Sequence, residues 1–117
     1  MANPNIVNVT DIRGKTAVTN ITTSATTLVE NSAASNKVFK INGLIISNIH
    51  GSDNASISVD FFRDSVAYHL VSTVTVPADA SIDVLSKSVY LQEGDALRVT
   101  ASANSFLQAV CSYEEIS

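Results

Sequence analysis

The stretch from Val89 to Ile116 reads Val-Tyr-Leu-Gln-Glu-Gly-Asp-Ala-Leu-Arg-Val-Thr-Ala-Ser-Ala-Asn-Ser-Phe-Leu-Gln-Ala-Val-Cys-Ser-Tyr-Glu-Glu-Ile. Residues 93–95 (Glu-Gly-Asp) and 103–105 (Ala-Asn-Ser) separate three runs of alternating apolar and polar residues, which predicts three strands joined by two turns. On the last two strands, the side chains expected on one buried face are Leu97, Val99, Ala101, Leu107, Ala109, Cys111 and Tyr113. One face of an antiparallel sheet is therefore expected to be buried.

The rest of the chain shows the same short alternating runs, with no stretch of helical period. Further strands are predicted at Ile6–Ile12, Thr26–Glu30, Lys37–His50, Ile57–Phe61, Ala67–Val76 and Ile82–Val84. Lys15–Thr23 is predicted to be a weaker strand or an extended arm, because its alternation is broken. Roughly eight or nine strands at this spacing are typical of an all-β antiparallel sandwich. We expect residues 1–117 to form a single, jelly-roll-like β-sandwich domain, although the pattern does not exclude a closed barrel.

Lys37–His50 is the longest apolar run and is expected to be a central strand covered on both sides at its middle. Strict alternation places Phe39, Ile41, Ile45 and Ile49 on one face, with Gly43 between them. Extending this rule along the chain predicts one shared core, made of Phe39, Ile41, Ile45, Val59, Phe61, Leu70, Val74, Leu97, Val99, Leu107 and Cys111.

The composition argues against several classes of partner. Of the 117 residues, 45% are hydrophobic and only 15% are charged, and the net charge is −4. An acidic chain lacks the basic face that nucleic acids and anionic membranes require. No run approaches the ~18 apolar residues of a membrane span, and the first residues lack the pattern of a signal peptide. We therefore expect a soluble protein made in a cytoplasm.

No residue pattern indicates chemistry. His50 and His69 have no nearby partner at metal-ligand spacing, and Cys111 is the single cysteine, on an apolar stripe. Residues 93–95 fit a turn in which Gly94 has positive φ and Asp95 bonds the backbone. No Gly-x-Ser-x-Gly elbow or glycine-rich phosphate loop is present. We expect neither an enzyme nor a protein that needs a metal or cofactor.

Two features predict protein interfaces. Phe62 and His69 point to the polar side of their predicted strands, and an interface would explain this orientation. Residues 1–12 combine a polar lead with a Val/Ile strand, so Ile6, Val7 and Val9 are candidates for an N-terminal arm that completes a neighbour's sheet. In the alternative, Ile6–Ile12 pairs within its own sandwich.

Three stretches resemble a known family. These are the opening Met-Ala-Asn-Pro-Asn-Ile-Val-Asn-Val-Thr, the central Ser-Asn-Lys-Val-Phe-Lys-Ile-Asn at 35–42, and the closing Tyr-Leu-Gln-Glu-Gly-Asp-Ala-Leu-Arg-Val-Thr-Ala-Ser-Ala with Cys-Ser-Tyr-Glu-Glu-Ile. They are similar to small structural proteins of marine tailed phages of the cyanophage type, and the similarity runs nearly end to end. The resemblance implies a β-sandwich virion component, made in the host bacterial cytoplasm, with other virion proteins as partners.

The family resemblance leaves two main functions open. The chain is either a capsid decoration or cement protein that stabilises the lattice of major capsid protein, or a neck, tail or fibre component. The latter would present its sandwich to a tail partner or a host glycan. Small size, an acidic hydroxyl-rich surface and the lack of a coiled-coil or collagen-like shaft favour decoration. A host-encoded glycan-binding module is a weaker third interpretation because the chain has no Trp. The sequence leaves homo-oligomerisation open.

Overall fold

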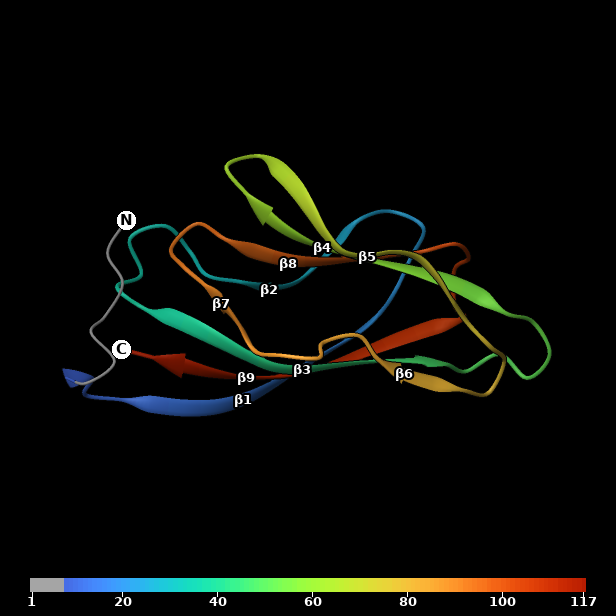
Figure 1. The fold of residues 1–117 in the computed structure, drawn as a ribbon, viewed down its shortest axis with the longest axis horizontal. Coiled ribbons are helices and arrows are strands. Elements are labelled where there is room, and N and C mark those ends of the chain that lie inside the picture. Colours follow the sequence, from blue (N-terminus) through green and yellow to red (C-terminus); the bar gives the residue numbers. More distant parts are fainter. Residues whose placement is uncertain (1–7) are drawn as a thin grey trace.

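Two antiparallel sheets face one another in the computed structural model, which describes residues 8–117 (Figure 1). The described residues form nine strands and no α-helix. The strands are β1 (Ile12–Asn20), β2 (Thr26–Glu30), β3 (Val38–Asn48), β4 (Ala55–Arg63), β5 (Val66–Val76), β6 (Ser81–Asp83), β7 (Val89–Leu91), β8 (Ala96–Ala101) and β9 (Leu107–Ile116). The predicted all-β antiparallel sandwich is confirmed.

The chain crosses repeatedly between the two layers. Sheet A has the order β1-β9-β3-β6, and β7 also pairs with β3. Sheet B has the order β2-β8-β4-β5. In Figure 1, sheet B lies above sheet A, and the tip of the β4–β5 hairpin projects away from both. The described residues therefore form two separate sheets and not the closed barrel, which the sequence pattern did not exclude.

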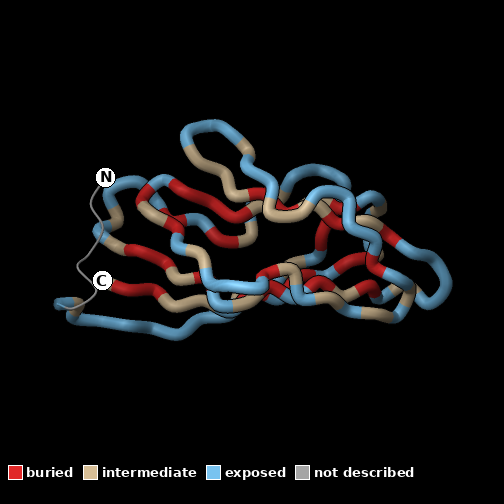
Figure 2. Tube along the Cα trace, in the orientation of Figure 1, coloured by how far each residue is buried: buried red, intermediate tan, exposed pale blue. Residues whose placement is uncertain are grey.

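Aliphatic side chains from both sheets fill the space between them. Residues with no exposed surface include Ile21, Ile41, Leu44, Ile46, Ile57, Val59, Val76, Leu91, Leu97, Val99, Leu107 and Cys111. Removal of their apolar surface from water is the main stabilising contribution, at roughly 25 cal/mol per Å². Figure 2 shows buried segments in both sheets. The core therefore fills the space between the layers.

The C-terminal block folds into the three predicted strands but not into hairpins. Gly94 has φ of 86°, and the Asp95 carboxylate accepts a hydrogen bond from the Gln92 N–H at 2.8 Å, as the turn chemistry predicts. However, β7 and β9 belong to sheet A whereas β8 belongs to sheet B. Both turns therefore carry the chain from one layer to the other.

The predicted strand boundaries near the N-terminus are wrong. Residues 8–11 are not in a strand, and β1 runs from Ile12 to Asn20 through Gly14, which lies between the predicted strands Ile6–Ile12 and Lys15–Thr23. A Cβ at Gly14 would meet nothing within 4 Å, and its φ is not positive. An extended conformation is therefore unhindered there, and pairing with β9 keeps β1 continuous.

A β-bulge in β3 corrects the predicted core. Ile41 pairs with Tyr113 and Gly43 with the preceding Ser112, so Asn42 is an extra residue and the alternation reverses after it. Leu44 and Ile46 consequently point into the core, whereas Ile45 is 46% exposed and Ile49 is 53% exposed. The core position predicted for Ile45 is therefore wrong.

The edge strand β5 accounts for the other differences in the core. Val74 lies opposite the buried Ile57 but is 38% exposed, so its predicted burial is wrong. Two register shifts interrupt the pairing of β5 with β4, and nothing pairs with the other side of β5 among the described residues. Phe61 and Leu70 are partly buried against the core. The remaining predicted core residues are buried, namely Phe39, Ile41, Val59, Leu97, Val99, Leu107 and Cys111.

An ion-pair cluster ties three segments of sheet A together at the end where the chain terminates. The Glu115 carboxylate accepts hydrogen bonds from the Lys15 ammonium at 2.8 Å and from the Lys37 ammonium at 2.6 Å. These two bonds hold the pKa of Glu115 below its ordinary value of 4.5. The hydrogen bond to Glu115 in turn raises the pKa of Lys15.

The Glu115 cluster predicts an acid-sensitive contribution to stability. Because the folded-state pKa of Glu115 is depressed, the contribution is present above pH 4.5 and is lost as pH falls through the folded-state pKa. The free energy of unfolding of the native chain should exceed that of Glu115→Gln by a constant amount from about pH 7 to about pH 5. The difference should shrink at lower pH in a series of urea titrations. A difference that grows on acidification would contradict the assigned pairing.

Candidate protein interface

The predicted interface residues do not form one surface. Ile6 and Val7 lie outside the described residues, and Val9 is half-buried just before β1 of sheet A. Phe62 and His69 instead lie on β4 and β5 of sheet B. The structure therefore brings Phe62 and His69 onto neighbouring strands of sheet B but places Val9 before the first strand of sheet A.

Only the end of the predicted N-terminal arm, residues 8–12, lies within the described residues. The backbone N–H groups of Thr10 and Asp11 donate to the Ser117 carbonyl at 2.7 and 3.0 Å, and Ile12 pairs with Ile116. Residues 10–12 are therefore bonded to the C-terminus of their own sandwich, and the arm predicted for Ile6 and Val7 stays a prediction.

Phe62 owes its outward orientation to a contact within the chain. The Arg98 guanidinium lies 3.9 Å from the centroid of the Phe62 ring, in a cation–π contact, and its Nε donates to the Asp60 carboxylate at 2.9 Å. Phe62 is half-buried as a result. His69 is exposed on β5 opposite Asp60. The outward register of Phe62 thus needs no partner to explain it.

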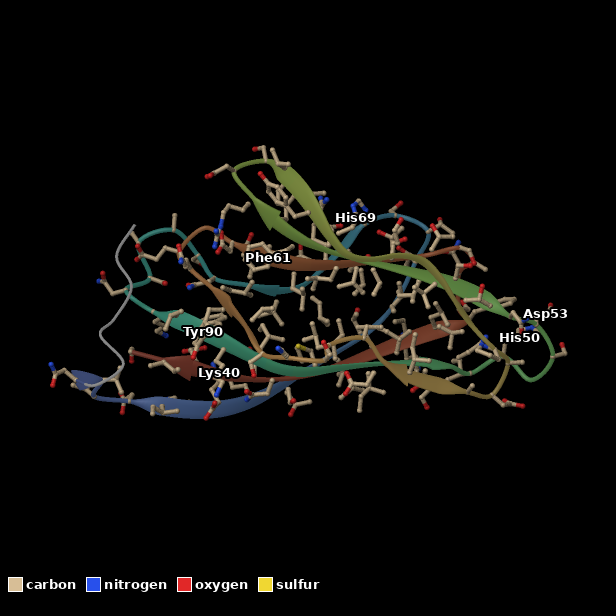
Figure 3. All side chains as sticks on the ribbon, viewed as in Figure 1. Lys40, His50, Asp53, Phe61, His69 and Tyr90 are labelled. Atoms are coloured by element: carbon tan, nitrogen blue, oxygen red, sulfur yellow. The ribbon has the colours of Figure 1, made fainter. Side chains whose placement is uncertain are left out.

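His50 has a structural role at the end of the sandwich. Its ring stacks on Phe106 with centroids 4.1 Å apart, and its Nδ1 accepts backbone N–H hydrogen bonds from Ser52 and Asp53 at 3.2 and 3.0 Å. Figure 3 shows His50 beside Asp53 and far from His69. His50 therefore holds the turn that connects β3 to β4.

The clearest candidate surface is a row of exposed apolar side chains that sequence reasoning missed. Val110 on β9 lies directly between Val18 on β1 and Ile45 on β3. These side chains are 40%, 69% and 46% exposed, respectively, on the outer face of sheet A. We call Val18, Ile45 and Val110 the apolar row. The cross-strand pairing forms one contiguous patch of the kind that marks an interaction site.

The apolar row is framed by uncharged residues. On one side, Ser112 of β9 lies between Thr16 and Gly43, and on the other side Gln108 lies between Asn20 and Ser47. An open depression of about 420 Å³ adjoins the row, lined by Val18, Thr19, Asn20, Gln108, Ala109 and Val110. The row is therefore uncharged on both sides along β1, β9 and β3, and the charged Asp83 of β6 adjoins it beyond Ile45.

A second, smaller depression lies on sheet B and is lined mainly by hydroxyl groups. It measures about 180 Å³, and its lining residues are Ser56, Ser58, Thr73, Thr100, Ala101 and Ser102. The Ser58 hydroxyl accepts a hydrogen bond from the Thr73 N–H at 2.9 Å, which helps fix the backbone of Thr73 at φ of 55°. Five of its six lining residues carry a hydroxyl group, so this surface offers hydrogen bonds.

The comparisons with known proteins show the fold alone. No family model and no curated protein matches the chain. Among solved structures, a protein of Bacillus endospore appendages, described as disulfide-linked pili, is 12% identical with a TM-score of 0.57, over 100% of this chain and 96% of that chain. The extra small virus of the giant freshwater prawn Macrobrachium rosenbergii gives 14% identity and a TM-score of 0.43, over 97% of this chain and 85% of that chain.

The described residues contain no arrangement suited to metal chemistry. No group of three or more His, Cys, Asp or Glu side chains in residues 8–117 could hold a metal ion. Burial raises the pKa of the Cys111 thiol to about 11, which keeps it protonated near neutral pH. Within the same residues, no helix is long and apolar enough to cross a membrane.

Proposed function

We propose that this chain is a structural component of a phage virion, and specifically a capsid decoration protein that binds and stabilises the lattice of major capsid protein. The observation that carries the proposal is the apolar row on the outer face of sheet A, flanked along β1, β9 and β3 by uncharged residues. Exposed apolar side chains that adjoin one another suit contact with another protein. The chain would act in the virion after synthesis in the cytoplasm of the bacterial host.

Two kinds of similarity support an assembly role. The sequence resembles small structural proteins of marine tailed phages nearly end to end. The sandwich also has the fold of a Bacillus endospore appendage protein. That neighbour is described as forming disulfide-linked pili, whereas Cys111 is the only cysteine here and is fully buried. We therefore expect any assembly of this chain to use noncovalent contacts.

Charge also favours binding through the outer face of sheet A. The chain carries a net charge of −4, so most of its surface would repel an acidic shell. Around the apolar row, the nearest charges are Asp83, which is paired with Ile45, and Lys40 beside Glu114. The outer face of sheet A faces solvent. It can therefore approach an acidic shell with little electrostatic repulsion.

The hydroxyl-lined depression on sheet B favours a second candidate function. As a neck, tail or fibre component, the chain would present this surface to a tail partner or to a host glycan. Serine and threonine hydroxyls can both donate and accept hydrogen bonds, as sugar hydroxyls do. The lining residues Ser56, Ser58, Thr73, Thr100 and Ser102 are the ones that would make such contacts.

A binding assay with purified shells tests the decoration proposal. The chain is mixed with shells assembled from the major capsid protein of the phage that encodes it, and co-sedimentation gives affinity and copy number. The variant Ile45→Ser with Val110→Ser polarises the apolar row without touching β1. We expect hundreds of bound copies per shell for the native chain. The variant should bind at least about tenfold more weakly, which corresponds to about 1.4 kcal/mol.

A matched control separates loss of the surface from loss of the fold. Val66→Ser with Tyr68→Ser alters two apolar residues on β5 near the tip of the β4–β5 hairpin, which are 46% and 57% exposed. This control should bind shells like the native chain. If the row variant also binds normally, the apolar row is not the contact. A stoichiometry of a few copies per particle would favour a neck, tail or fibre position.

A further inference from the structure

The four sheet edges differ in how well they are protected against pairing with another chain. β6 and β7 span three residues each, and β2 spans five residues with a register shift. β5 is long, but two register shifts interrupt its pairing. β1 spans nine residues in unbroken register with β9, and no other described strand pairs with it. Short or bulged strands resist edge pairing, so β1 is the open edge.

The side chains of β1 leave this edge accessible. All of its residues are exposed except Ala17 and Thr19, which are half-buried, and Figure 2 shows the strand exposed along nearly its whole length. The strand contains no proline and no acidic residue. Lys15 is held by Glu115, so its ammonium is directed onto its own sheet. Of the features that usually keep an edge strand from pairing with another chain, β1 therefore has only the charge of Arg13.

We propose that β1 pairs antiparallel with β1 of a second copy of this chain, about a two-fold axis at Thr16. In this register, Ile12 faces Asn20 of the second copy and Thr16 faces itself, so all nine residues of the strand are paired. Main-chain hydrogen bonds supply the contact, and they join the two copies of sheet A into one continuous sheet.

Charge selects this register over its neighbours. Centring the axis on Thr16 places Lys15 opposite Ala17 and Arg13 opposite Thr19 of the second copy. A centre at Lys15 would oppose two lysines, and a centre at Gly14 would oppose Arg13 and Lys15, both of which are destabilising. Centres nearer the C-terminal end leave part of the strand unpaired. The register at Thr16 alone pairs the full strand with no like charges opposed.

Charged side chains introduced at Thr16, on the two-fold axis, test the pairing of the two β1 strands in solution. Thr16 is exposed, so Thr16→Lys and Thr16→Glu should fold normally while each places two like charges opposite one another. We expect the native chain to sediment as a dimer, and each variant alone to dissociate at least about tenfold more readily. An equimolar mixture of the two variants should restore a dimer, because Lys then faces Glu. The control Thr75→Lys, on the edge strand β5, should leave the dimer intact.

Single cysteines test the register. Thr16→Cys should form a covalent dimer on mild oxidation, since residues opposite one another have Cβ atoms roughly 5 Å apart. Ile12→Cys alone should not, because the two copies of residue 12 would be separated by roughly 27 Å, from eight residues at about 3.4 Å each. A mixture of Ile12→Cys and Asn20→Cys should form a mixed covalent dimer. Cys111 is fully buried and stays out of the reaction.

The proposal fails if the native chain is monomeric at about 100 μM, a concentration well above the Kd of a specific homodimer. It also fails if neither charge variant changes the dimer. Efficient cross-linking of Ile12→Cys alone would contradict the register at Thr16. These measurements use the isolated full-length chain and do not depend on the proposed virion function. The shell-binding assay and the dimer assay can therefore fail separately.

Discussion

Replacing Ile46 with Ala should lower the free energy of unfolding by about 2–5 kcal/mol, whereas replacing the adjacent Ile45 should lower it by at most about 1 kcal/mol. The two residues are of the same type and lie on the same strand, but Ile46 is fully buried and Ile45 is 46% exposed. Truncation of Ile46 leaves a cavity in the core, whereas truncation of Ile45 leaves only a smaller side chain in water. Guanidinium titration of both variants measures the difference.

The comparison of Ile46 with Ile45 decides where β3 changes register. Strict alternation from Phe39 and Ile41 would bury Ile45, and the bulge at Asn42 buries Ile46 instead. If Ile45→Ala lowered the free energy of unfolding more than Ile46→Ala does, β3 would have no bulge at Asn42. The titrations should be made on dilute protein, so that self-association does not add to the stability of either variant.

The fold class was predictable because the alternation of apolar residues is long and regular in most strands. The bulge in β3 was not, because both alternatives place aliphatic residues in the core: Ile45 in one, Leu44 and Ile46 in the other. Gly43 was the available signal, since an isolated glycine within a strand often marks a bulge. The pairing with β9 decides between the two registers, and a single strand's sequence does not contain that information.

The C-terminal block shows a second limit of sequence reasoning. Gly94 and Asp95 identify the turn between β7 and β8, because positive φ and a carboxylate near free backbone N–H groups are local requirements. Whether a turn returns the chain to the same sheet or crosses to the other sheet depends on distant partners. β3 provides the partner for β7, and β2 and β4 provide the partners for β8.

Prediction of the candidate interface needed knowledge of long-range strand pairing even more than prediction of the fold did. Val18, Val110 and Ile45 come from strands far apart in the chain, and each alone is one exposed aliphatic residue. Pairing of the three strands makes them a patch. Conversely, Phe62 was singled out because it points outward, yet Arg98 from β8 covers its ring. Sequence reasoning identified the unusual residue but could not supply its partner.

The second large effect is expected at Arg63, where replacement by Met should lower the free energy of unfolding by about 2–4 kcal/mol. The Asp95 carboxylate is 1% exposed and accepts two hydrogen bonds from the Arg63 guanidinium, at 2.8 and 2.6 Å. The loss of Arg63 leaves a buried carboxylate with the Gln92 N–H as its remaining hydrogen bond among the described contacts. The cost should stay below that of a fully buried pair because the Arg63 side chain is 35% exposed.

An exposed pair of the same residue types provides the control. Arg13 and Asp11 lie 4.0 Å apart with side chains 69% and 59% exposed, so Arg13→Met should change stability by less than about 0.5 kcal/mol. A double-mutant cycle with Asp95→Asn isolates the interaction at Arg63. Asp95→Asn makes this side chain neutral, so removing the guanidinium no longer leaves a buried charge without its partner. The double variant should therefore lose at least about 1 kcal/mol less stability than the sum of the losses of the single variants. Additive losses would instead mean that Arg63 stabilises the hairpin through its packing on Phe61, over whose ring the guanidinium lies at 4.9 Å.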